Sequence, residues 1–337
     1  MLDRNKNQTF KSELRQDLVT GEWVVISPKR KKRPSTPFIE AHYRYKEQAE
    51  CIFCDPVKSH QEKDVLIYYD GNKRWIVRVF PNKYPAFQRR NSLNKKLHGP
   101  YLTEDAIGFH EVVVTRDHKR SLAYIDLSEV AGVLRAYQER YIKLMNKKFV
   151  DYILVFYNHG RTAGASVAHP HSQLIAMPFV SMDIQKEIWG AEDYFLKNRE
   201  CVFCRMVDQE LTEKKRIVFQ NEYFVVFCPF ASRMGYEMWL VPKEHHPYFE
   251  RLEQGGRDKA AEALKEALSR LDKLLEEPDY NFYLHTSPCD GRIHSYYHWH
   301  IEILPKYSTW AGFELGTGIE INTVLPENAA EELRLIV

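Results

Sequence analysis

The feature that most constrains the fold of this chain is an internal repeat. The first half contains CIFC, GFHEVVVTRDH and NHGRTAGASVAHPHSQLIAMP, and the second half contains CVFC, GYEMWLVPKEH and HTSPCDGRIHSYYHWHIEILP, in the same order. The two CxxC pairs begin 150 residues apart, and the histidines that open HPH and HWH lie 129 residues apart. A long unit that occurs twice indicates a duplicated domain and not a stack of short repeats.

Each half shows the same succession of strand and helix patterns. Runs of β-branched and aromatic residues predict strands at 110–115, 152–157, 173–177, 237–241, 281–285 and 299–304. Apolar residues spaced three and four apart predict one long helix in each half, at 128–147 and 260–276, and a connecting helix at 181–198. We therefore predict an α+β fold of two tandem units, 1–180 and 181–337, each an antiparallel sheet packed with a helix.

Charge and hydropathy exclude several classes of protein. The 337 residues include 48 Lys and Arg against 46 Asp and Glu, a net charge of +2, which gives no bulk attraction to nucleic acid or to an anionic membrane. No apolar run approaches the roughly 18–20 residues of a membrane helix, and the polar N-terminus does not resemble a signal peptide. We expect a cytoplasmic protein. The one dense basic run, SPKRKKRP at 27–34, is by itself equally consistent with a solvated loop.

Four of the six cysteines form the two CxxC pairs, and in a reducing compartment such pairs favour metal or redox chemistry. Zinc takes four nitrogen or sulfur ligands in a tetrahedron, and each half offers two cysteines and two histidines at matched positions. The predicted sets are Cys51, Cys54, His118 and His169 in the first half, and Cys201, Cys204, His245 and His298 in the second. Two closed four-ligand sites predict structural zinc that leaves no open position for water.

Alternatives to this metal hypothesis remain open. The cysteines could be buried structural thiols, although the matched histidines would then be accidental. A redox CxxC normally opens a helix in a βαβ unit, and neither pair is expected to do so. His246 is an alternative ligand to its neighbour His245. Iron is an alternative to zinc in the second site.

The segment His169-Pro170-His171-Ser172-Gln173 enters a predicted strand. Alternate residues of a strand face the same side, so His171 and Gln173 share a surface with the metal-ligand candidate His169. A neutral histidine is an effective nucleophile toward phosphorus near pH 7. The preceding glycine-rich run, residues 160–166, offers backbone N–H groups for a phosphate. These neighbours favour a nucleophilic His171 over a histidine of the core.

Several segments together resemble a known family. NHGRTAGASVAHPHSQ, at 158–173, is similar to the active site of galactose-1-phosphate uridylyltransferases, the nucleotidyltransferase branch of the histidine triad superfamily. ELRQDLVTGEWVVISPKRKKRP resembles that family's N-terminal strand and phosphate-binding loop, and VFPNKYPAF its nucleoside-contacting segment. YHWHIEILP and GFELGTGIEINTVLPENAAEEL look closer to a sister group, the ADP-glucose phosphorylase-like adenylyltransferases.

The resemblance implies a ping-pong reaction. His171 would take a nucleoside monophosphate from a nucleotide sugar such as UDP-glucose and pass it to a hexose 1-phosphate. Gln173 would donate to the nonbridging phosphate oxygens, where related hydrolases carry a third histidine. The family forms homodimers, and its substrate contacts fall on these positions: Arg30 and Arg33 for phosphate, Asn82 for ribose, Asn158, Gly164 and Ser166 for the α-phosphate, and Phe313 and Gly316 for the hexose, across the subunit boundary.

Two departures from the family pattern bear on the function. Glu302 stands where the second half would match Gln173, and a carboxylate repels phosphate, so we predict that His300 is not a nucleophile and that each chain has one reaction centre. Thr317 and Gly318 stand where galactose-specific relatives carry Tyr-Glu. The alternatives are an ADP-glucose phosphorylase or adenylyltransferase with phosphate as acceptor, a histidine-triad hydrolase, which Gln173 disfavours, and a zinc-knuckle nucleic-acid-binding protein. The choice between uracil and adenine stays open.

Overall fold

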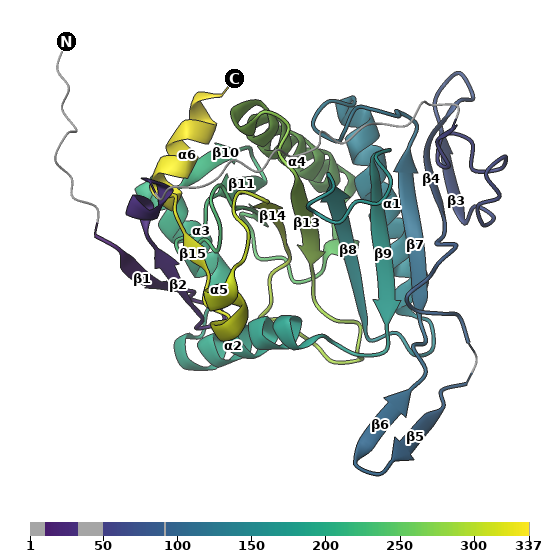
Figure 1. Cartoon of the computed structure of the whole chain (residues 1–337), viewed down its shortest axis with the longest axis horizontal. Coiled ribbons are helices and arrows are strands. Elements are labelled where there is room, and N and C mark those ends of the chain that lie inside the picture. The colour runs from purple at the N-terminus through teal and green to yellow at the C-terminus, as the bar shows by residue number, and fades with distance from the viewer. Residues whose placement is uncertain (1–10, 33–49, 91, 337) are drawn as a thin grey trace.

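The computed structural model describes residues 11–32, 50–90 and 92–336. Its centre is one antiparallel sheet of ten strands (Figure 1). In spatial order the strands are β10 (Ile217–Gln220), β11 (Phe224–Phe227), β12 (Met238–Pro242), β14 (His300–Pro305), β13 (Tyr280–His285), β8 (Tyr152–His159), β9 (His171–Met177), β7 (Phe109–Thr115), β4 (Trp75–Pro81) and β3 (Leu66–Tyr69).

The repeat is visible in this order. Read outward from the centre, the first half contributes β8, β9, β7, β4 and β3, and the second half contributes the matching β13, β14, β12, β11 and β10. The two halves join where β8 pairs with β13, with Asn158 opposite Asn281. The predicted α+β class with antiparallel sheets is confirmed. The sequence did not reveal that the two sheets are continuous, and the division at residue 180 stays a prediction.

Two long helices cover one face of the sheet. α1 (Leu127–Met145) and α4 (Gln254–Leu275) pack against each other and lie behind the strands in Figure 1. Their apolar stripes meet inward-facing strand residues such as Leu174 and Ile303 in one buried cluster. Because successive strand residues alternate between faces, His171 and Gln173 project from the opposite face.

The opposite face is covered differently in the two halves. Over the second half, α2 (Met182–Asn198) and α3 (Val202–Glu213) bury it, with Ile188 and Phe203 in one cluster with Trp239. Over the first half, the loop of the first CxxC pair packs on the sheet instead, placing Phe53 in a smaller cluster with Val112 and Val114. The duplicated units therefore share a sheet but differ in what covers the face opposite α1 and α4.

Smaller elements complete the described chain. β1 (Glu13–Gln16), β2 (Trp23–Ile26) and β15 (Ile321–Asn322) form a second sheet beside the second half, followed after β2 by the 3-10 turn Pro28–Lys32. α5 (Gly312–Thr317) and α6 (Pro326–Leu335) lie at that same end in Figure 1. The hairpin of β5 (Lys95–His98) and β6 (Tyr101–Glu104) projects from the other half. Within the described residues, no helix combines the length and apolar character needed to cross a membrane.

Arg233 neutralises buried acids beneath the second half. It contacts Glu302, and its Nη2 lies 3.3 Å from an oxygen of Glu237 and 3.3 Å from the Tyr283 hydroxyl. Burial alone would raise the pKa of Glu302, but Arg233 and the neighbouring His300 and His285 hold that pKa well below its usual range. The arginine therefore permits a charged carboxylate inside the fold.

We expect Arg233→Met to lower the free energy of unfolding by about 3–5 kcal/mol, because it leaves buried carboxylates without their cation. Arg74→Met is the matched control. Its ion pair with Asp70 has an arginine side chain that is 61% exposed, so the loss should be under about 1 kcal/mol. Urea unfolding followed by circular dichroism measures both changes, and equal losses in the two variants would contradict the prediction.

Candidate active site

The first CxxC pair meets two histidines from the sheet. Cys54 Sγ lies 3.1 Å from Nδ1 of His118, which follows β7, and 3.4 Å from Nδ1 of His169, which precedes β9. Cys51 Sγ lies 3.4 Å from His169 Nδ1, and the two histidine Nδ1 atoms are 3.3 Å apart. The structure thus brings together all four residues of the first predicted set.

These four atoms fit a tetrahedral ion. Zinc bonds of about 2.0–2.3 Å place neighbouring ligand atoms roughly 3.3–3.8 Å apart. His169 also donates from Nε2 to the Thr115 carbonyl over 2.8 Å, which turns its Nδ1 lone pair toward the group. Such a second hydrogen bond is the usual companion of a metal-bound histidine. The donor set suits zinc, and a bound ion would hold the CxxC loop against the strand ends.

The second predicted set is assembled in the same way. Cys204 Sγ lies 3.4 Å from His245 Nδ1 and 3.5 Å from His298 Nδ1, and Cys201 Sγ lies 4.0 Å from His298 Nδ1. The four ligand atoms lie within 4.8 Å of one another. His245, and not His246, belongs to this group, and its Nε2 donates to the Ser295 carbonyl over 2.7 Å.

One argument about the cysteine pairs is wrong for the second pair. We expected neither pair to open a helix, yet Cys201 is the N-cap of α3. In a redox βαβ unit a strand precedes the CxxC helix, whereas here the helix α2 precedes α3. The second pair therefore still differs from the redox motif.

His171 begins β9 on the face opposite the helices. Its Nδ1 lies 2.8 Å from the carbonyl oxygen of His169, which can only accept, so Nδ1 carries the proton and Nε2 keeps its lone pair. The ring of Phe53 packs 5.1 Å away, centroid to centroid. Burial lowers the pKa of His171, which favours the neutral, nucleophilic form. The arrangement presents one reactive nitrogen from a fixed imidazole.

Three amide side chains lie on strands and a loop of this same half. Gln173 is two residues beyond His171 on β9 and opposite Phe156 of β8. Asn158 stands near the end of β8, and Asn82 directly follows β4. All three are partly buried. A histidine flanked by neutral hydrogen-bond donors suits attack on an anionic phosphate.

The glycine-rich loop lies between β8 and β9. Gly160 and Gly164 have φ angles of +81° and +90°, which favour glycine. Asp279, from the second half, accepts from the Thr162 backbone N–H and hydroxyl, both over 2.6 Å. A Cβ on Gly160 would lie 1.6 Å from a carboxylate oxygen of Asp279, so the loop closes tightly on that residue. Gly164 and Ser166 are exposed.

Other predicted site residues lie elsewhere in the chain. Arg30 belongs to the turn after β2, and Phe313 and Gly316 belong to α5. β2, which precedes that turn, packs on Ala231 of the second half, and α5 lies beside β2 and β15 in Figure 1, whereas β9 belongs to the first half. One chain therefore does not bring Arg30, Phe313 and Gly316 to His171. Arg33 lies outside the described residues.

The second half closes the corresponding reactive face. His300 is fully buried and Glu302 is 2% exposed. Glu187, from α2, lies within 3.9 Å of His300. Glu302 is paired with Arg233, as described above. A substrate would not reach His300 through this packing, which agrees with the prediction of a single reaction centre.

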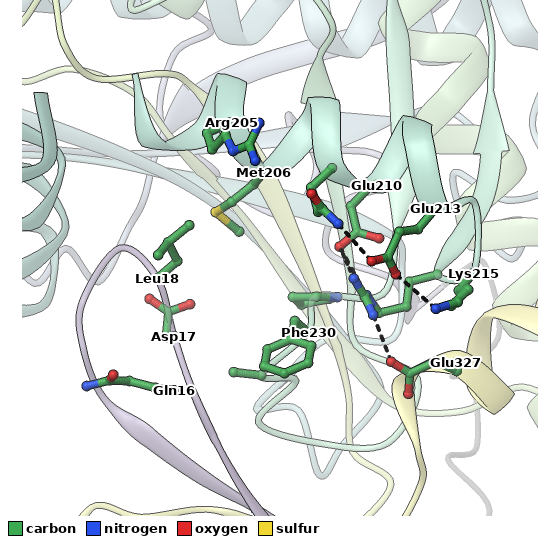
Figure 2. Close-up of a pocket in the computed structure, with 14 residues that line it drawn as sticks. Gln16, Asp17, Leu18, Arg205, Met206, Glu210, Glu213, Lys215, Phe230 and Glu327 are labelled. Atoms are coloured by element: carbon green, nitrogen blue, oxygen red, sulfur yellow. Dashed lines mark hydrogen bonds and ion pairs between the residues drawn. The ribbon is translucent and has the colours of Figure 1, made fainter. Parts of the chain in front are cut away.

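A pocket of about 710 Å³ is lined by none of the metal-ligand candidates, although Arg205 and Met206, which follow Cys204, belong to its wall (Figure 2). It is bounded by the turn after β1, by α3 and by the loop around Phe230. Beside it, the buried Arg216 pairs with Glu210 and Glu327, each at 2.8 Å. This pocket contains none of the predicted site residues, and its ion pairs tie α3 to α6.

Sequence reasoning missed three residues that contact the site: Asp279, Asn281 and His110. Asn281 donates to the Asn158 side chain over 2.8 Å, and His110 lies 2.8 Å from the Gln173 side chain. His110 was visible inside the predicted strand 110–115, but its contact depends on strand register. The other two depend on the pairing of β8 with β13, which no sequence pattern indicated.

The continuous sheet of two matched halves, with His171 on the face opposite the helices and beside a Cys2His2 group, defines the histidine-triad-like nucleotidyltransferases as the class of this protein. A model of the galactose-1-phosphate uridyl transferase N-terminal domain matches residues 3–181, and a domain of unknown function, DUF4921, matches residues 106–335. The chain belongs to the galactose-1-phosphate uridylyltransferase family.

Its relatives carry two different names. The chain is 33% identical to an ADP-glucose phosphorylase of Arabidopsis thaliana, over 98% of this chain and 94% of the relative. It is 30% identical to a galactose-1-phosphate uridylyltransferase of Thermotoga maritima, over 96% and 98%. The crystal structure of the Arabidopsis ADP-glucose phosphorylase with bound ADP-glucose superposes with a TM-score of 0.83 at 32% identity, covering 97% of this chain and all of that one.

Proposed function

We propose that this protein transfers a nucleoside monophosphate from a nucleotide sugar to a phosphorylated acceptor, through a covalent intermediate on His171. The observation that carries the proposal is the orientation of that imidazole. Its Nδ1–H is held by the His169 carbonyl, and its Nε2 lone pair is free on a face lined with amide side chains.

The reaction follows from this geometry. His171 Nε2 attacks the α-phosphorus, an N–P bond forms, and the bond from phosphorus to the bridging oxygen breaks to release a sugar 1-phosphate. An oxygen of the acceptor phosphate then attacks the same phosphorus, and the N–P bond breaks. The positive charge on the substituted ring is stabilised by the bond from Nδ1–H to the His169 carbonyl. Neither step needs a strong base, since the acceptor is already an anion.

The metal groups would act on structure alone. Zinc bound by Cys51, Cys54, His118 and His169 has four protein ligands and no open position, so its contribution is to fix the strand ends beside His171. The second group would fasten α3 and the loop of His245 to the start of β14. We propose zinc at both groups.

We propose UDP-glucose as donor and a hexose 1-phosphate as acceptor, as the family name implies. A second candidate, ADP-glucose with phosphate as acceptor, is favoured by the 33% identity to an ADP-glucose phosphorylase. It is also favoured by Thr317 and Gly318, which replace the Tyr-Glu pair of the galactose-specific pattern.

We also propose a homodimer. Arg30, Phe313 and Gly316 match substrate-contacting positions of the family, yet they lie on elements beyond the second half of the sheet. A second copy could bring them to His171. Sedimentation should therefore show a dimer.

The donor is decided by the mass of the intact protein after brief exposure to UDP-glucose or to ADP-glucose without acceptor. We expect a nucleotide adduct that acid removes and that the correct acceptor discharges. An adduct from ADP-glucose alone overturns the uridylyl assignment, and an adduct from neither overturns the proposed function.

A further inference from the structure

The three amide side chains near His171 share one feature. In each, the side-chain oxygen already accepts a hydrogen bond from the protein. Which amide atom is the oxygen follows in each case from a backbone N–H, which can only donate, or a backbone carbonyl, which can only accept. For Asn82 the backbone contact is direct, because the Tyr84 backbone N–H donates to its Oδ1 over 2.8 Å. The Asn82 NH₂ group therefore stays available as a donor.

For Gln173 the tie runs through His110. The Ala86 backbone N–H lies 3.2 Å from His110 Nδ1 and can only donate, so that nitrogen is bare. In a neutral ring the proton is then on Nε2, which lies 2.8 Å from Gln173 and donates to its Oε1. Burial lowers the pKa of His110, which keeps the ring neutral. The Asn82 amide nitrogen, 3.2 Å from the same Nε2, then makes no bond to it.

For Asn158 the tie runs through Asn281. The Asn281 amide nitrogen lies 2.8 Å from the Ala163 carbonyl, which can only accept, so this atom is the donor Nδ2. The same Nδ2 lies 2.8 Å from the Asn158 side chain and must meet its oxygen. Asn158 Nδ2 is thereby turned toward the glycine-rich loop, 3.7 Å from where a Cβ on Gly164 would stand.

We propose that His110 and Asn281 are positioning residues that hold the amides of Gln173 and Asn158 with their N–H groups toward the substrate phosphates. This inference rests on the proposed nucleotidyl transfer. Its physical content is preorganisation: a freely rotating amide offers a phosphate its oxygen as often as its nitrogen, whereas a fixed one offers only donors. Because amide donors carry no net charge, they neither repel the acceptor phosphate nor favour protonation or deprotonation of His171.

The first test measures the single-turnover rate of nucleotide adduct formation in His110 variants. Removal of one hydrogen-bond donor from an oxyanion hole costs about 10²–10³-fold, and we expect a loss of that order for Gln173→Ala. His110→Leu should slow the rate by about 10–100-fold. His110→Gln, whose amide can donate from a similar place, should recover most of it, while substrate affinity and thermal stability change little.

Double variants separate positioning from a general structural effect. If His110 acts only through Gln173, His110→Leu adds nothing in the Gln173→Ala background. In the same way, Asn281→Leu should slow the wild type by about tenfold or more and add nothing in the Asn158→Ala background. Additive losses in both pairs would overturn the proposal.

A second measurement does not depend on activity. In a ¹⁵N-labelled protein, long-range ¹H–¹⁵N spectra report which imidazole nitrogen carries the proton, and His110→Leu identifies the His110 signals. We expect protonated Nε2 and bare Nδ1 at pH 7. A proton on Nδ1 contradicts the positioning of Gln173 whether or not an adduct forms, whereas the expected tautomer without any adduct contradicts only the proposed function.

Discussion

His171→Ala should carry no nucleotide after incubation with UDP-glucose or ADP-glucose, whereas the wild-type chain retains an acid-labile adduct. The variant removes the imidazole whose Nδ1 is held by the His169 carbonyl and whose Nε2 is the proposed nucleophile. In other enzymes with a covalent nucleophile, its removal costs on the order of 10⁶-fold in turnover. Intact-mass measurement and steady-state rates check the two parts of this prediction.

The second half supplies a matched control. His300 occupies the equivalent strand position, and its Nδ1 likewise lies 3.1 Å from the carbonyl of the residue two before it. It is fully buried, so His300→Ala, assayed at a temperature where it is folded, should still form the adduct. An adduct on His171→Ala, or its loss only in His300→Ala, would move the reaction centre to the other half.

Replacing a ligand of the first metal group should have the largest effect on stability. We expect two zinc ions per wild-type chain by elemental mass spectrometry and one in Cys51→Ser. The binding free energy of a structural zinc ion is roughly 10–16 kcal/mol, so we expect the free energy of unfolding of the variant to fall by about 5 kcal/mol or more. Adduct formation should fall too, because His169 then no longer fixes the backbone that holds His171.

Cys289→Ser is the control for this experiment. Cys289 is partly buried and belongs to neither metal group, and its thiol contacts the Val150 carbonyl at 3.7 Å. It should keep both zinc ions and lose about 1 kcal/mol. A Cys51→Ser chain that keeps two ions and full stability would refute the first site.

The sequence predicted those parts of the fold that rest on local pattern. The strand and helix runs and the matched spacing of cysteines and histidines were enough to place the central strands, α1, α4 and both metal groups. Short strands such as β1 and β15 carry too few residues for a period to be read. α3 does carry apolar residues four apart, Phe203, Val207 and Leu211, but this stretch was interpreted only as the CxxC motif and its helix was not predicted.

The parts that could not be predicted depend on contacts between distant segments. Nothing in the residues of β8 or β13 specifies that these two strands pair, yet this pairing brings Asn281 to Asn158. The location of Arg30 is a similar case, because the family resemblance implies a phosphate contact while the path of β2 takes it away from His171. Motif resemblance identifies a residue's role and leaves its position to tertiary structure.

The pairing of β8 with β13 also gives the second half a part in the proposed reaction centre. Asp279 and Asn281 of the second half bond to Thr162 and Ala163 of the glycine-rich loop, which binds the phosphate in the proposed reaction. In the proposed reaction, the first half therefore performs the chemistry, and the second half holds the glycine-rich loop in its conformation. We therefore expect substitutions of Asp279 or Asn281 to slow the proposed transfer although both residues lie in the second half, and separating the two halves would remove these contacts from the loop.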